Sequence, residues 1–460
     1  MQRRDIPGMT GPLVGPDDPG YAAACLGFNG AHPHHPELIA YCASPEDVAA
    51  VVQWARQAGK ALHLRSSGHC VAGHSSGDGV VLDLSRLTGV RLEADVAHVG
   101  AATTFATLTA ALRGTGWHLP VGLCDSVCVA GYTQGGGYGL TSRLVGMMCD
   151  RAVGFTVLLA DGSIVRADAA QHADLFWALR GAGGGHLGVV LAISLRMARL
   201  DAAWAFAVEW SAEDALAALD LVQRRYCGPA APDALGHIMN LGFHAGRPAY
   251  CLQGLYCGTP EAGRALIAPL RAAGGALALD RVGEFADASV AAAEVPYEFP
   301  EALPTGFAYR KWGGYLTRCL PRRVWGELLA VFERSPNAWS MVYLEPYGGA
   351  INRVGPLDTA FVHRGALANL VVNIFWDSEA ERARVTAWLL EVQRLLAPWL
   401  SGHVYQNYRD PWLDDHRHAY WGAAWPRLAE VKARYDPEDV FRSPQGISPA
   451  REAIARRAVR

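Results

Sequence analysis

Two glycine-rich stretches of the sequence carry residue types that can do chemistry. RSSGHCVAG, residues 65–73, contains His69, and GLCDSVCVAGYTQGGGYG, residues 122–139, contains Cys124 eleven positions before a triple glycine. Glycine lets the backbone approach a ligand closely, and loops of this kind commonly hold phosphate through their N–H groups. Imidazole and thiolate are nucleophilic enough to attack an electron-poor ring. Alone, each stretch is also compatible with a plain glycine turn, a hydrogen-bonded histidine or a buried thiol.

A third stretch, HVYQNY at residues 403–408, supplies candidate acid–base groups. Read as a strand, it places Tyr405 and Asn407 on one face and Gln406 and Tyr408 on the other. A tyrosine that acts as a base near neutral pH must have its pKa lowered from about 10 by two or more units, which requires roughly 3 kcal/mol of preferential phenolate stabilisation. The sequence does not identify the cation or donor that would supply it.

Two histidine-containing segments are interpreted as solvated loops rather than metal sites. HPHHP at residues 32–36 is stiffened by its flanking prolines, and DDHRHAY at residues 414–420 has no spacing typical of zinc ligands. We therefore predict no metal site.

The composition is that of a well-buried globular protein. The chain has 460 residues, of which 51% are hydrophobic and 18% charged, and this length favours two domains. A formal charge of −3 offers no basic surface for nucleic acid, and no apolar run approaches the roughly 18 residues of a membrane span. Two arginines near the N-terminus precede no apolar segment, and ten cysteines lack tight regular spacing, so a cytoplasmic location is expected.

Up to about residue 205, short strands and glycine turns alternate with helices. Ser44 followed by Pro45 predicts the start of a helix that ends at Gly59, and Asp161-Gly162 predicts the turn of a β-hairpin over residues 153–167. Further strands are expected at residues 38–43, 61–68, 80–87 and 97–105, and further helices at residues 105–116 and 174–181.

Residues 206–402 have a different pattern, in which strand-like segments alternate with helices rich in alanine, leucine and arginine. This alternation predicts an antiparallel sheet backed by helices, which could cap a site on the first domain. The expected organisation is therefore an α+β protein with one domain at residues 1–205, completed by residues 403–460, and a second at residues 206–402.

The pairing of RSSGHCVAG with LCDSVCVAGYTQGGGYG resembles the flavin-linked oxidases of the vanillyl-alcohol oxidase class, and most closely their berberine-bridge-enzyme-like group. Further stretches that fit, in order, are residues 174–190, residues 343–354 with His363-Arg364, and VYQNY with YDPEDVFRSPQGI near the end. The resemblance implies a PCMH-type FAD-binding domain of two α/β subdomains, formed by residues 1–205 and 403–460, and a substrate-binding domain at residues 206–402.

The resemblance also implies roles for individual residues. His69 matches the histidine that bonds the 8α-methyl of the flavin, and Cys124 matches the cysteine that bonds carbon 6 of the ring. Val127 matches a position that gates oxygen, where valine goes with oxidases and leucine with dehydrogenases. Residues 65–73 are expected to wrap the pyrophosphate. The full set expected to hold FAD is Arg65, Ser66, Ser67, Gly68, His69, Cys70, Gly73, His74, Gly122, Cys124, Val127, Gly131, Tyr132, Gly135, Gly136, Gly137, Tyr138, Gly139, Gly188, Val189, Val190 and Asn407.

The catalytic base is assigned by the same resemblance. Tyr408 is the first candidate and Tyr405 the second, because the segment resembles the Y-x-N-Y motif of the family. Asn373 lies nearest to the position of a carboxylate or amide that assists in relatives, and as an amide it could only orient a partner.

Three positions depart from the family pattern: Cys128 stands where glycine is usual, Tyr132 where histidine is usual, and His186 where asparagine is usual. Cys128 adds bulk beside the oxygen gate, which argues against a fast reaction with O2.

The implied function is an oxidase that moves a hydride from a C–OH or C–NH carbon to covalently bound FAD and passes the electrons to O2, giving H2O2. Sugar, glycoside, polyketide or alkaloid substrates are expected, in secondary-metabolite tailoring or oligosaccharide oxidation, with no nucleic-acid or membrane partner. Two alternatives remain: a flavin dehydrogenase with another acceptor, and a non-redox protein that binds a drug or metabolite on the same fold. The sequence does not indicate the oligomeric state.

Overall fold

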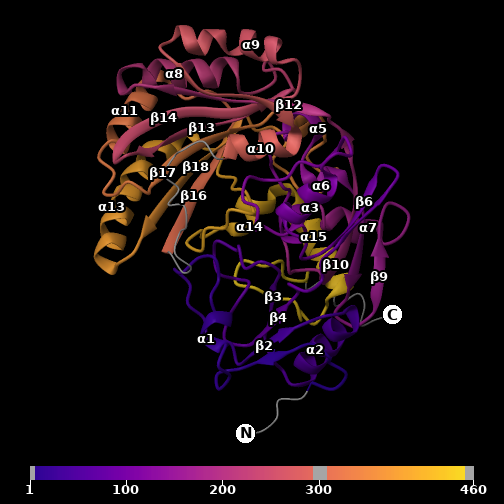
Figure 1. Ribbon diagram of the computed structural model, residues 1–460. Helices are drawn as coiled ribbons and strands as arrows, with labels where there is room; N and C mark the ends of the chain where they lie inside the picture. Colours follow the sequence, from indigo (N-terminus) through magenta and orange to yellow (C-terminus); the bar gives the residue numbers. More distant parts are fainter. Residues whose placement is uncertain (1–5, 294–307, 451–460) are drawn as a thin grey trace.

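The computed structural model describes residues 6–293 and 308–450. Three sheets of four, five and seven strands organise these residues, with helices on their faces (Figure 1). The predicted α+β class is confirmed. The two N-terminal arginines that bear on the predicted cytoplasmic location lie outside the described residues, and that location stays a prediction.

The four-stranded sheet lies at the N-terminal end of the molecule, drawn in indigo in Figure 1. Its order is β1-β2-β4-β3, with β2, β4 and β3 parallel. The strands are β1 (Leu13–Val14), β2 (Leu38–Tyr41), β3 (Leu62–Arg65) and β4 (Val80–Asp83). Helix α2 (Pro45–Gln57) begins as predicted, because the Ser44 side chain accepts a hydrogen bond from the N–H of Asp47 over 3.2 Å.

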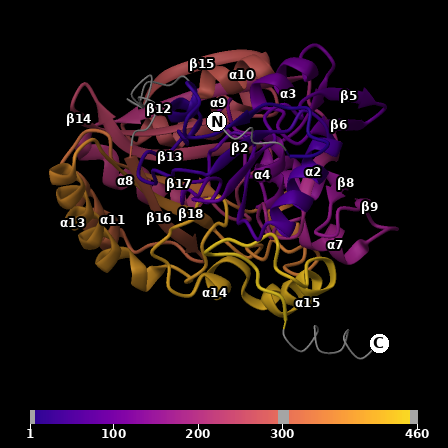
Figure 2. The same cartoon turned by 90° about the horizontal axis from the view of Figure 1, so that it is seen from below.

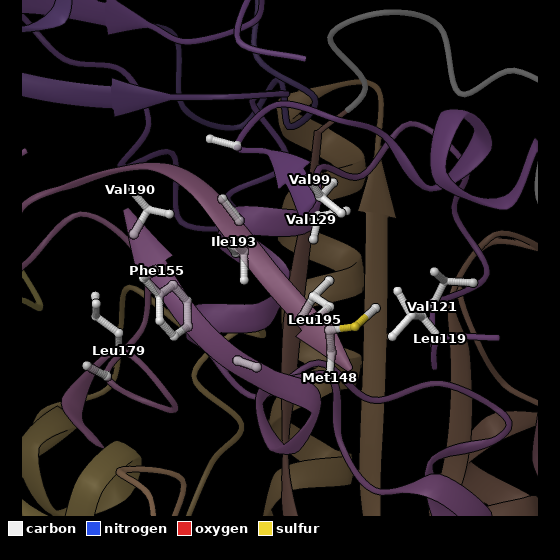
Figure 3. Packing of buried hydrophobic residues seen from close by; sticks show 14 of the residues in the cluster. Val99, Leu119, Val121, Val129, Met148, Phe155, Leu179, Val190, Ile193 and Leu195 are labelled. Carbon is white, nitrogen blue, oxygen red and sulfur yellow. The ribbon is translucent and has the colours of Figure 1, made fainter. Parts of the chain in front are cut away.

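The five-stranded sheet is antiparallel, in the order β5-β6-β10-β8-β9. Its strands are β5 (Val90–Glu93), β6 (Val96–Gly100), β8 (Ala152–Leu158), β9 (Ile164–Ala167) and β10 (Val189–Arg196). The hairpin predicted over residues 153–167 is confirmed, and Gly162 in its turn has φ +89°. Phe155 and Ile193 pair across β8 and β10 and are fully buried in the core of this sheet (Figure 3).

The seven-stranded antiparallel sheet has the order β15-β12-β14-β13-β17-β18-β16. Its strands are β12 (Ala202–Trp210), β13 (Leu235–His244), β14 (Arg247–Tyr256), β15 (Ala276–Glu284), β16 (Ala308–Leu316), β17 (Met341–Pro346) and β18 (Ala368–Trp376). The antiparallel sheet was predicted, but β15 and β16 were not. The domain boundaries stay a prediction, although β12 begins close to the predicted one.

One face of this sheet is covered by long helices, and the other, the free face, packs in part against the core of the five-stranded sheet (Figure 1). The covering helices are α8 (Ala212–Arg225), α9 (Pro260–Ala272), α11 (Arg322–Phe332) and α13 (Glu379–Leu396), while α10 (Phe285–Ala293) packs on β12 and β15. No helix within the described residues is long and apolar enough to cross a bilayer.

The remaining elements are short and connect the sheets. They are α1 (Tyr21–Ala24), α3 (Phe105–Leu112), β7 (Trp117–His118), α4 (Val129–Gln134), α5 (Ser142–Val145), α6 (Met148–Arg151), α7 (Ala173–Ala178), β11 (Ala198–Arg199), α12 (Ala350–Arg353) and the 3-10 helices Ala397–Trp399 and Gly422–Ala424.

The C-terminal segment carries α14 (His416–Trp421) and α15 (Trp425–Tyr435) and runs along one side of the molecule (Figure 2). Helix α15 packs against α7, and the buried Lys432 ammonium donates to the carbonyl of His186 over 2.9 Å. The strand predicted at residues 403–408 is wrong. The N–H of Tyr408 donates to the carbonyl of Tyr405 over 2.8 Å, which closes a turn, so side chains do not alternate there.

Candidate cofactor site and active site

A cavity of about 810 Å³ lies between the two glycine-rich stretches and the free face of the seven-stranded sheet. Its walls come from segments far apart in the sequence: the loop after β3, residues 122–140, the loop before β10, strands β13, β16, β17 and β18, and residues 406–409 and 441–443. A cavity of this size is typical of sites for cofactors and small molecules.

His69 and Cys124 meet at one wall of this cavity, although 55 positions separate them in the sequence. The hydroxyl of Ser126 lies 2.8 Å from His69 Nε2 and 3.5 Å from Cys124 Sγ. The imidazole stacks on Phe28 with ring centroids 4.0 Å apart. Burial, and then the charge of Lys311, lower the pKa of His69 to about 4, so the imidazole is neutral at physiological pH.

Most residues predicted to hold FAD line the cavity. They are Ser66, Ser67, Gly68, His69, Cys70, His74, Gly122, Cys124, Val127, Gly131, Tyr132, Tyr138, Gly139, Gly188, Val189, Val190 and Asn407. The predicted base Tyr408 and the predicted assisting residue Asn373 line it too. The predicted residues that do not line it are Arg65, Gly73, Gly135, Gly136, Gly137 and Tyr405.

Arg65 does not line the cavity, and its role in holding FAD stays a prediction. Its Nε donates to Asp83 over 2.6 Å, and its Nη1 donates to the carbonyl of Ala24 over 2.7 Å. Both members of this ion pair are buried, and it joins the ends of β3 and β4. Arg65 therefore fixes the loop that follows it.

The triple glycine packs against protein and does not line the cavity, so its contact with FAD stays a prediction. A Cβ on Gly135 would lie 1.9 Å from Asn407 Oδ1. The N–H of Gly137 donates to the hydroxyl of Tyr405 over 2.8 Å. These glycines let residues 405–408 approach closely and thereby position Tyr408.

Other glycines line the cavity with open space beside them. A Cβ on Gly131 meets nothing within 4 Å, and one on Gly68 meets nothing nearer than 3.8 Å. Gly68 has φ +74°, which favours glycine whatever the surroundings, so a bound ligand explains the small size of Gly131 alone.

The predicted oxygen gate lies at the start of α4. Val127 is half-buried and lines the cavity. The next residue, Cys128, is buried, and its thiol donates to the carbonyl of Ala102 over 3.1 Å. Burial raises the pKa of Cys128, so the sulfur stays protonated. Tyr132, the second departure, donates its hydroxyl to the carbonyl of Pro120 over 2.9 Å.

The third departure, His186, reaches the C-terminal segment. An N–H of the Arg409 guanidinium donates to His186 Nε2 over 2.6 Å, which places the ring hydrogen of this histidine on Nδ1. Among the residues that the structure describes, that Nδ1 is buried without a hydrogen-bond partner, as are His74 Nδ1 and Ser443 Oγ, and all three residues line the cavity. Buried polar atoms normally have hydrogen-bond partners, so these orphaned atoms indicate that a polar ligand belongs here.

The free face of the seven-stranded sheet presents polar side chains in register. Lys311 on β16 is opposite Asn373 on β18, which in turn is opposite Met341 on β17. Tyr343 lies two residues after Met341 on β17, and Glu345 lies two residues after Tyr343. Strand alternation therefore places all three on the same face. The Oδ1 atom of Asn373 is buried without a partner.

Tyr408 and Glu345 form a hydrogen-bonded pair at this wall. The Tyr408 hydroxyl donates to Glu345 Oε1 over 2.7 Å, and Asn369 Nδ2 donates to Glu345 Oε2 over 2.8 Å. Burial raises the pKa of Glu345 above its usual value, against the opposing effects of Asn369, Tyr408 and Lys311. The pair therefore joins a phenol to a carboxylate of increased basicity.

The lowered tyrosine pKa that a phenolate base requires is not found. Burial, followed by the negative charge of Glu345, raises the pKa of Tyr408 well above its usual range. Tyr408 is therefore a neutral phenol in the resting protein, and Glu345 is the group beside it that can take a proton. The side chain hydrogen-bonded to Tyr408 is that of Glu345, and the assisting role of Asn373 stays a prediction.

Lys311 is the cation that the sequence did not identify. Its Nζ donates to the Tyr343 hydroxyl over 2.9 Å and lies 4.2 Å from the centroid of the Tyr408 ring. Burial lowers the pKa of Lys311 to about 8, and Glu345 and Cys124 oppose that shift. At neutral pH the ammonium is charged, so it can stabilise negative charge that develops near Tyr408.

Tyr405 is placed for structure. Its hydroxyl accepts from the N–H groups of Gly137 and Tyr138 over 2.8 and 3.2 Å, and from Asn407 Nδ2 over 3.0 Å. Three donors occupy this oxygen, so the geometry favours Tyr408 over Tyr405 as the group that meets a substrate.

Glu345, Lys311 and Ser126 were missed as functional residues. A carboxylate within the apolar run MVYLEP was a usable signal, since a buried strand rarely carries an acid without a purpose. Lysine is rare in this chain and appears in the segment AYRKWGGYL, but its two glycines weaken the strand pattern.

The histidine-containing segments show no metal cluster. Asp415 accepts from the N–H of His418 over 3.1 Å and caps α14. Within residues 6–293 and 308–450, no three histidine, cysteine, aspartate or glutamate side chains are grouped as metal ligands.

Comparison with known proteins identifies matching family models and relatives. A family model described as FAD binding domain matches residues 36–168, and one described as berberine and berberine like matches residues 404–448. The FAD-linked oxidoreductase YgaK of Bacillus subtilis is 27% identical over 454 residues, covering 97% of this chain and 98% of YgaK. A chitooligosaccharide oxidase of Gibberella zeae is 27% identical over 457 residues, covering 92% and 89% of the two chains.

The fold is similar to that of solved structures. The solved structure of a chitooligosaccharide oxidase superposes with a TM-score of 0.84 at 23% identity and covers 96% of this chain and 97% of its own. The two family models match the chain in order, one on the glycine-rich loops and one on the segment that carries Tyr408. The chain is therefore an FAD-linked oxidoreductase of the berberine-bridge-enzyme-like family.

Proposed function

We propose that this protein is an oxidase acting on a C–OH or C–NH group of a small polar substrate, with Tyr408 and Glu345 removing the proton. When bound, FAD supplies the acceptor for the hydride and passes the electrons to O2. The observation that carries the proposal is the 2.7 Å hydrogen bond from Tyr408 to Glu345 at the wall of the cavity.

The proton path follows from the direction of that hydrogen bond. The Tyr408 oxygen uses its hydrogen to contact Glu345, so its lone pairs can accept the hydrogen of a substrate hydroxyl. As the substrate loses its hydride, its proton moves to Tyr408 Oη while the Tyr408 hydrogen moves to Glu345 Oε1. Asn369 holds the carboxylate in place through its other oxygen.

Lys311 supports this transfer electrostatically. Its ammonium lies 4.2 Å from the centroid of the Tyr408 ring. A cation over an aromatic face stabilises negative charge that builds up on the ring and its oxygen during the transfer. Its charge also opposes the rise in the pKa of Glu345 that burial causes.

The chemistry of the sheet wall favours a hydroxyl-rich substrate. Besides the groups already named, Asn240 on β13 and Gln253 on β14 line the cavity and are buried. Amide side chains both donate and accept, which matches the hydroxyls of a sugar or glycoside. The similarity to a chitooligosaccharide oxidase supports this class, and that to an aclacinomycin oxidase of Streptomyces galilaeus, at 26% identity, supports a glycosylated or polyketide metabolite.

Two covalent links to FAD are part of the proposal. His69 would bond the 8α carbon and Cys124 would bond carbon 6. The support is their position at one cavity wall, each in contact with Ser126. His69 is neutral and Cys124 is exposed, and both conditions suit a nucleophile.

A flavin dehydrogenase is the second candidate, and Cys128 is the observation that favours it. This side chain lines the cavity next to Val127, where glycine is usual in the family. Anaerobic reduction by substrate followed by mixing with air separates the two functions. Fast reoxidation supports an oxidase, and slow reoxidation with fast transfer to an artificial acceptor supports a dehydrogenase.

A peroxide-release screen tests the proposed function. Neutral sugars, oligosaccharides, aromatic glycosides, polyketides and alkaloids are offered to the wild-type protein, and each positive is repeated with Tyr408→Phe. We expect peroxide with at least one sugar or glycoside, and a loss of it in the variant. If no compound reduces the bound flavin anaerobically, the proposal is wrong.

A further inference from the structure

We propose that Ser126 positions both His69 and Cys124 for attachment of the flavin, so that one hydroxyl serves two covalent links. This inference rests on the proposed covalent attachment of FAD. Ser126 itself does not line the cavity, whereas the two residues that it contacts do. It therefore acts through them and is a positioning residue.

The backbone holds Ser126 in place independently of any ligand. The N–H of Val127 donates to the carbonyl of Cys124 over 3.1 Å and closes a tight turn with Ser126 inside it. The N–H groups of Phe105 and Ala106, at the start of α3, donate to the carbonyls of Val127 and Asp125 over 3.0 and 3.1 Å. The serine hydroxyl is thus presented from a fixed turn.

For His69, this hydroxyl selects the reactive nitrogen. His69 is neutral, so only one ring nitrogen carries hydrogen. If Nε2–H donates to Ser126 over the 2.8 Å contact, Nδ1 keeps a free lone pair, and within the described residues no group forms a hydrogen bond with that atom. Phe28 fixes the plane of the imidazole by stacking. The hydrogen bond at Nε2 and the stacking of the ring on Phe28 together orient Nδ1 as the nucleophile.

For Cys124, the same hydroxyl holds the sulfur in place. With its oxygen accepting from His69, Ser126 can donate its hydrogen to Cys124 Sγ over the 3.5 Å contact. This contact fixes the position of Sγ, and the thiolate is the form of the sulfur that attacks. The chain of donors therefore runs from His69 through Ser126 to Cys124.

Formation of each covalent link to the flavin is an oxidation that consumes one dioxygen. The imidazole N–H and one C–H of the 8α-methyl are replaced by a C–N bond, and the two hydrogens with their electrons leave as one hydrogen peroxide. The thiol S–H and the C–H at carbon 6 are replaced by a C–S bond, with a second hydrogen peroxide. Two peroxides are therefore expected for each protein that becomes fully linked, and none without oxygen.

The test uses full-length protein produced under riboflavin limitation and then supplied with FAD in air. Ser126→Thr keeps the hydroxyl, and Ser126→Val has nearly the same shape without it. Asp125→Ala, an exposed neighbour on the same turn, controls for disturbance of the turn. The readouts are flavin retained in an acid pellet over time, the masses of the peptides that contain His69 and Cys124, and peroxide released.

We expect Ser126→Thr and Asp125→Ala to attach flavin at the wild-type rate. Ser126→Val should attach it about tenfold more slowly at both His69 and Cys124, as loss of a hydrogen bond to a reacting group predicts. Equal rates for valine and threonine, with equal thermal unfolding, overturn the role of Ser126. If the wild-type protein itself never retains flavin in acid, the proposed covalent attachment fails instead.

Discussion

The hydroxyl of Tyr408 donates to Glu345 Oε1 across 2.7 Å, and the two residues come from a C-terminal turn and from the central part of the substrate-facing sheet. Two separate segments must therefore be placed correctly before a proton can leave the substrate. The turn depends on the triple glycine, and the carboxylate depends on Asn369.

Replacing Tyr408 with phenylalanine should abolish proton transfer while leaving the fold intact. The ring stays and only the oxygen is lost, so FAD binding and thermal unfolding should be near wild type. The rate of anaerobic flavin reduction by substrate should fall by about 10²–10⁴-fold, the usual worth of a positioned acid–base group. Tyr405→Phe is the contrast: it leaves two backbone N–H groups without their acceptor and should lower the unfolding temperature. Equal reduction rates in wild type and Tyr408→Phe would contradict the assignment.

Glu345 should determine how the rate of anaerobic flavin reduction falls at acid pH. Its pKa is raised above the ordinary 4.5, so anaerobic reduction should rise with pH through an apparent pKa above that value. Glu345→Gln should remove this fall and leave a slow, flat rate. A raised pKa also means that the stabilising effect of the bound proton is lost as pH rises through the folded pKa. The glutamine variant should therefore be more stable than wild type near neutral pH, as measured by thermal unfolding.

Lys311 should determine how the rate of anaerobic flavin reduction falls at alkaline pH. Its pKa is lowered to about 8, so reduction should slow above that pH as the ammonium loses its charge. Lys311→Met should be slow at all pH values and lack this fall. A lysine with a lowered pKa destabilises the folded state where it is charged, so the methionine variant should unfold at a higher temperature at pH 7, and this difference should shrink towards pH 10.5. Lys311→Arg keeps the charge and should retain part of the rate.

The local patterns of the chain predicted most elements, because caps and turns act within a few residues. Ser44 starts α2 and Gly162 turns the hairpin as predicted. The strand β16 was missed because Gly313 and Gly314 interrupt its apolar pattern. A Cβ at Gly313 would lie 2.1 Å from the carbonyl oxygen of Leu370, so the neighbouring strand requires glycine there.

The site was predictable only where a motif spans it. His69 and Cys124 were found because each lies in a glycine-rich stretch with its own signature. The partner of Tyr408 was not, since Glu345 is 63 positions away and only the register of β17 and β18 brings it to the cavity. Ser126 was missed because a serine in a turn carries no signal until its two neighbours are known.

Substitution by alanine should have different effects at Gly135, which packs against protein, and at Gly131, which lines the cavity. At Gly135 the new Cβ would lie 1.9 Å from Asn407 Oδ1, so Gly135→Ala should displace residues 405–408, lower the unfolding temperature and reduce activity. At Gly131 the Cβ meets nothing within 4 Å, so Gly131→Ala should fold normally but bind less FAD, as measured by absorbance of the purified protein. Normal flavin content in Gly131→Ala would show that this glycine does not face the cofactor.

Val127 and Cys128 should control the reaction with oxygen separately from the reaction with substrate. Both line the cavity, and the hydrogen bond of Cys128 goes to Ala102 while that of Tyr408 goes to Glu345, so enlarging or reducing them should leave anaerobic reduction unchanged. Val127→Leu adds one methylene at the predicted gate and should slow reoxidation by air by about tenfold, equivalent to about 1.4 kcal/mol of barrier. Cys128→Gly removes bulk next to it and should speed reoxidation. Stopped-flow mixing of the reduced protein with oxygenated buffer measures both. If Cys128→Gly has no effect while Val127→Leu does, the thiol held by Ala102 lies outside the oxygen path, and the family departure at this position has no kinetic consequence.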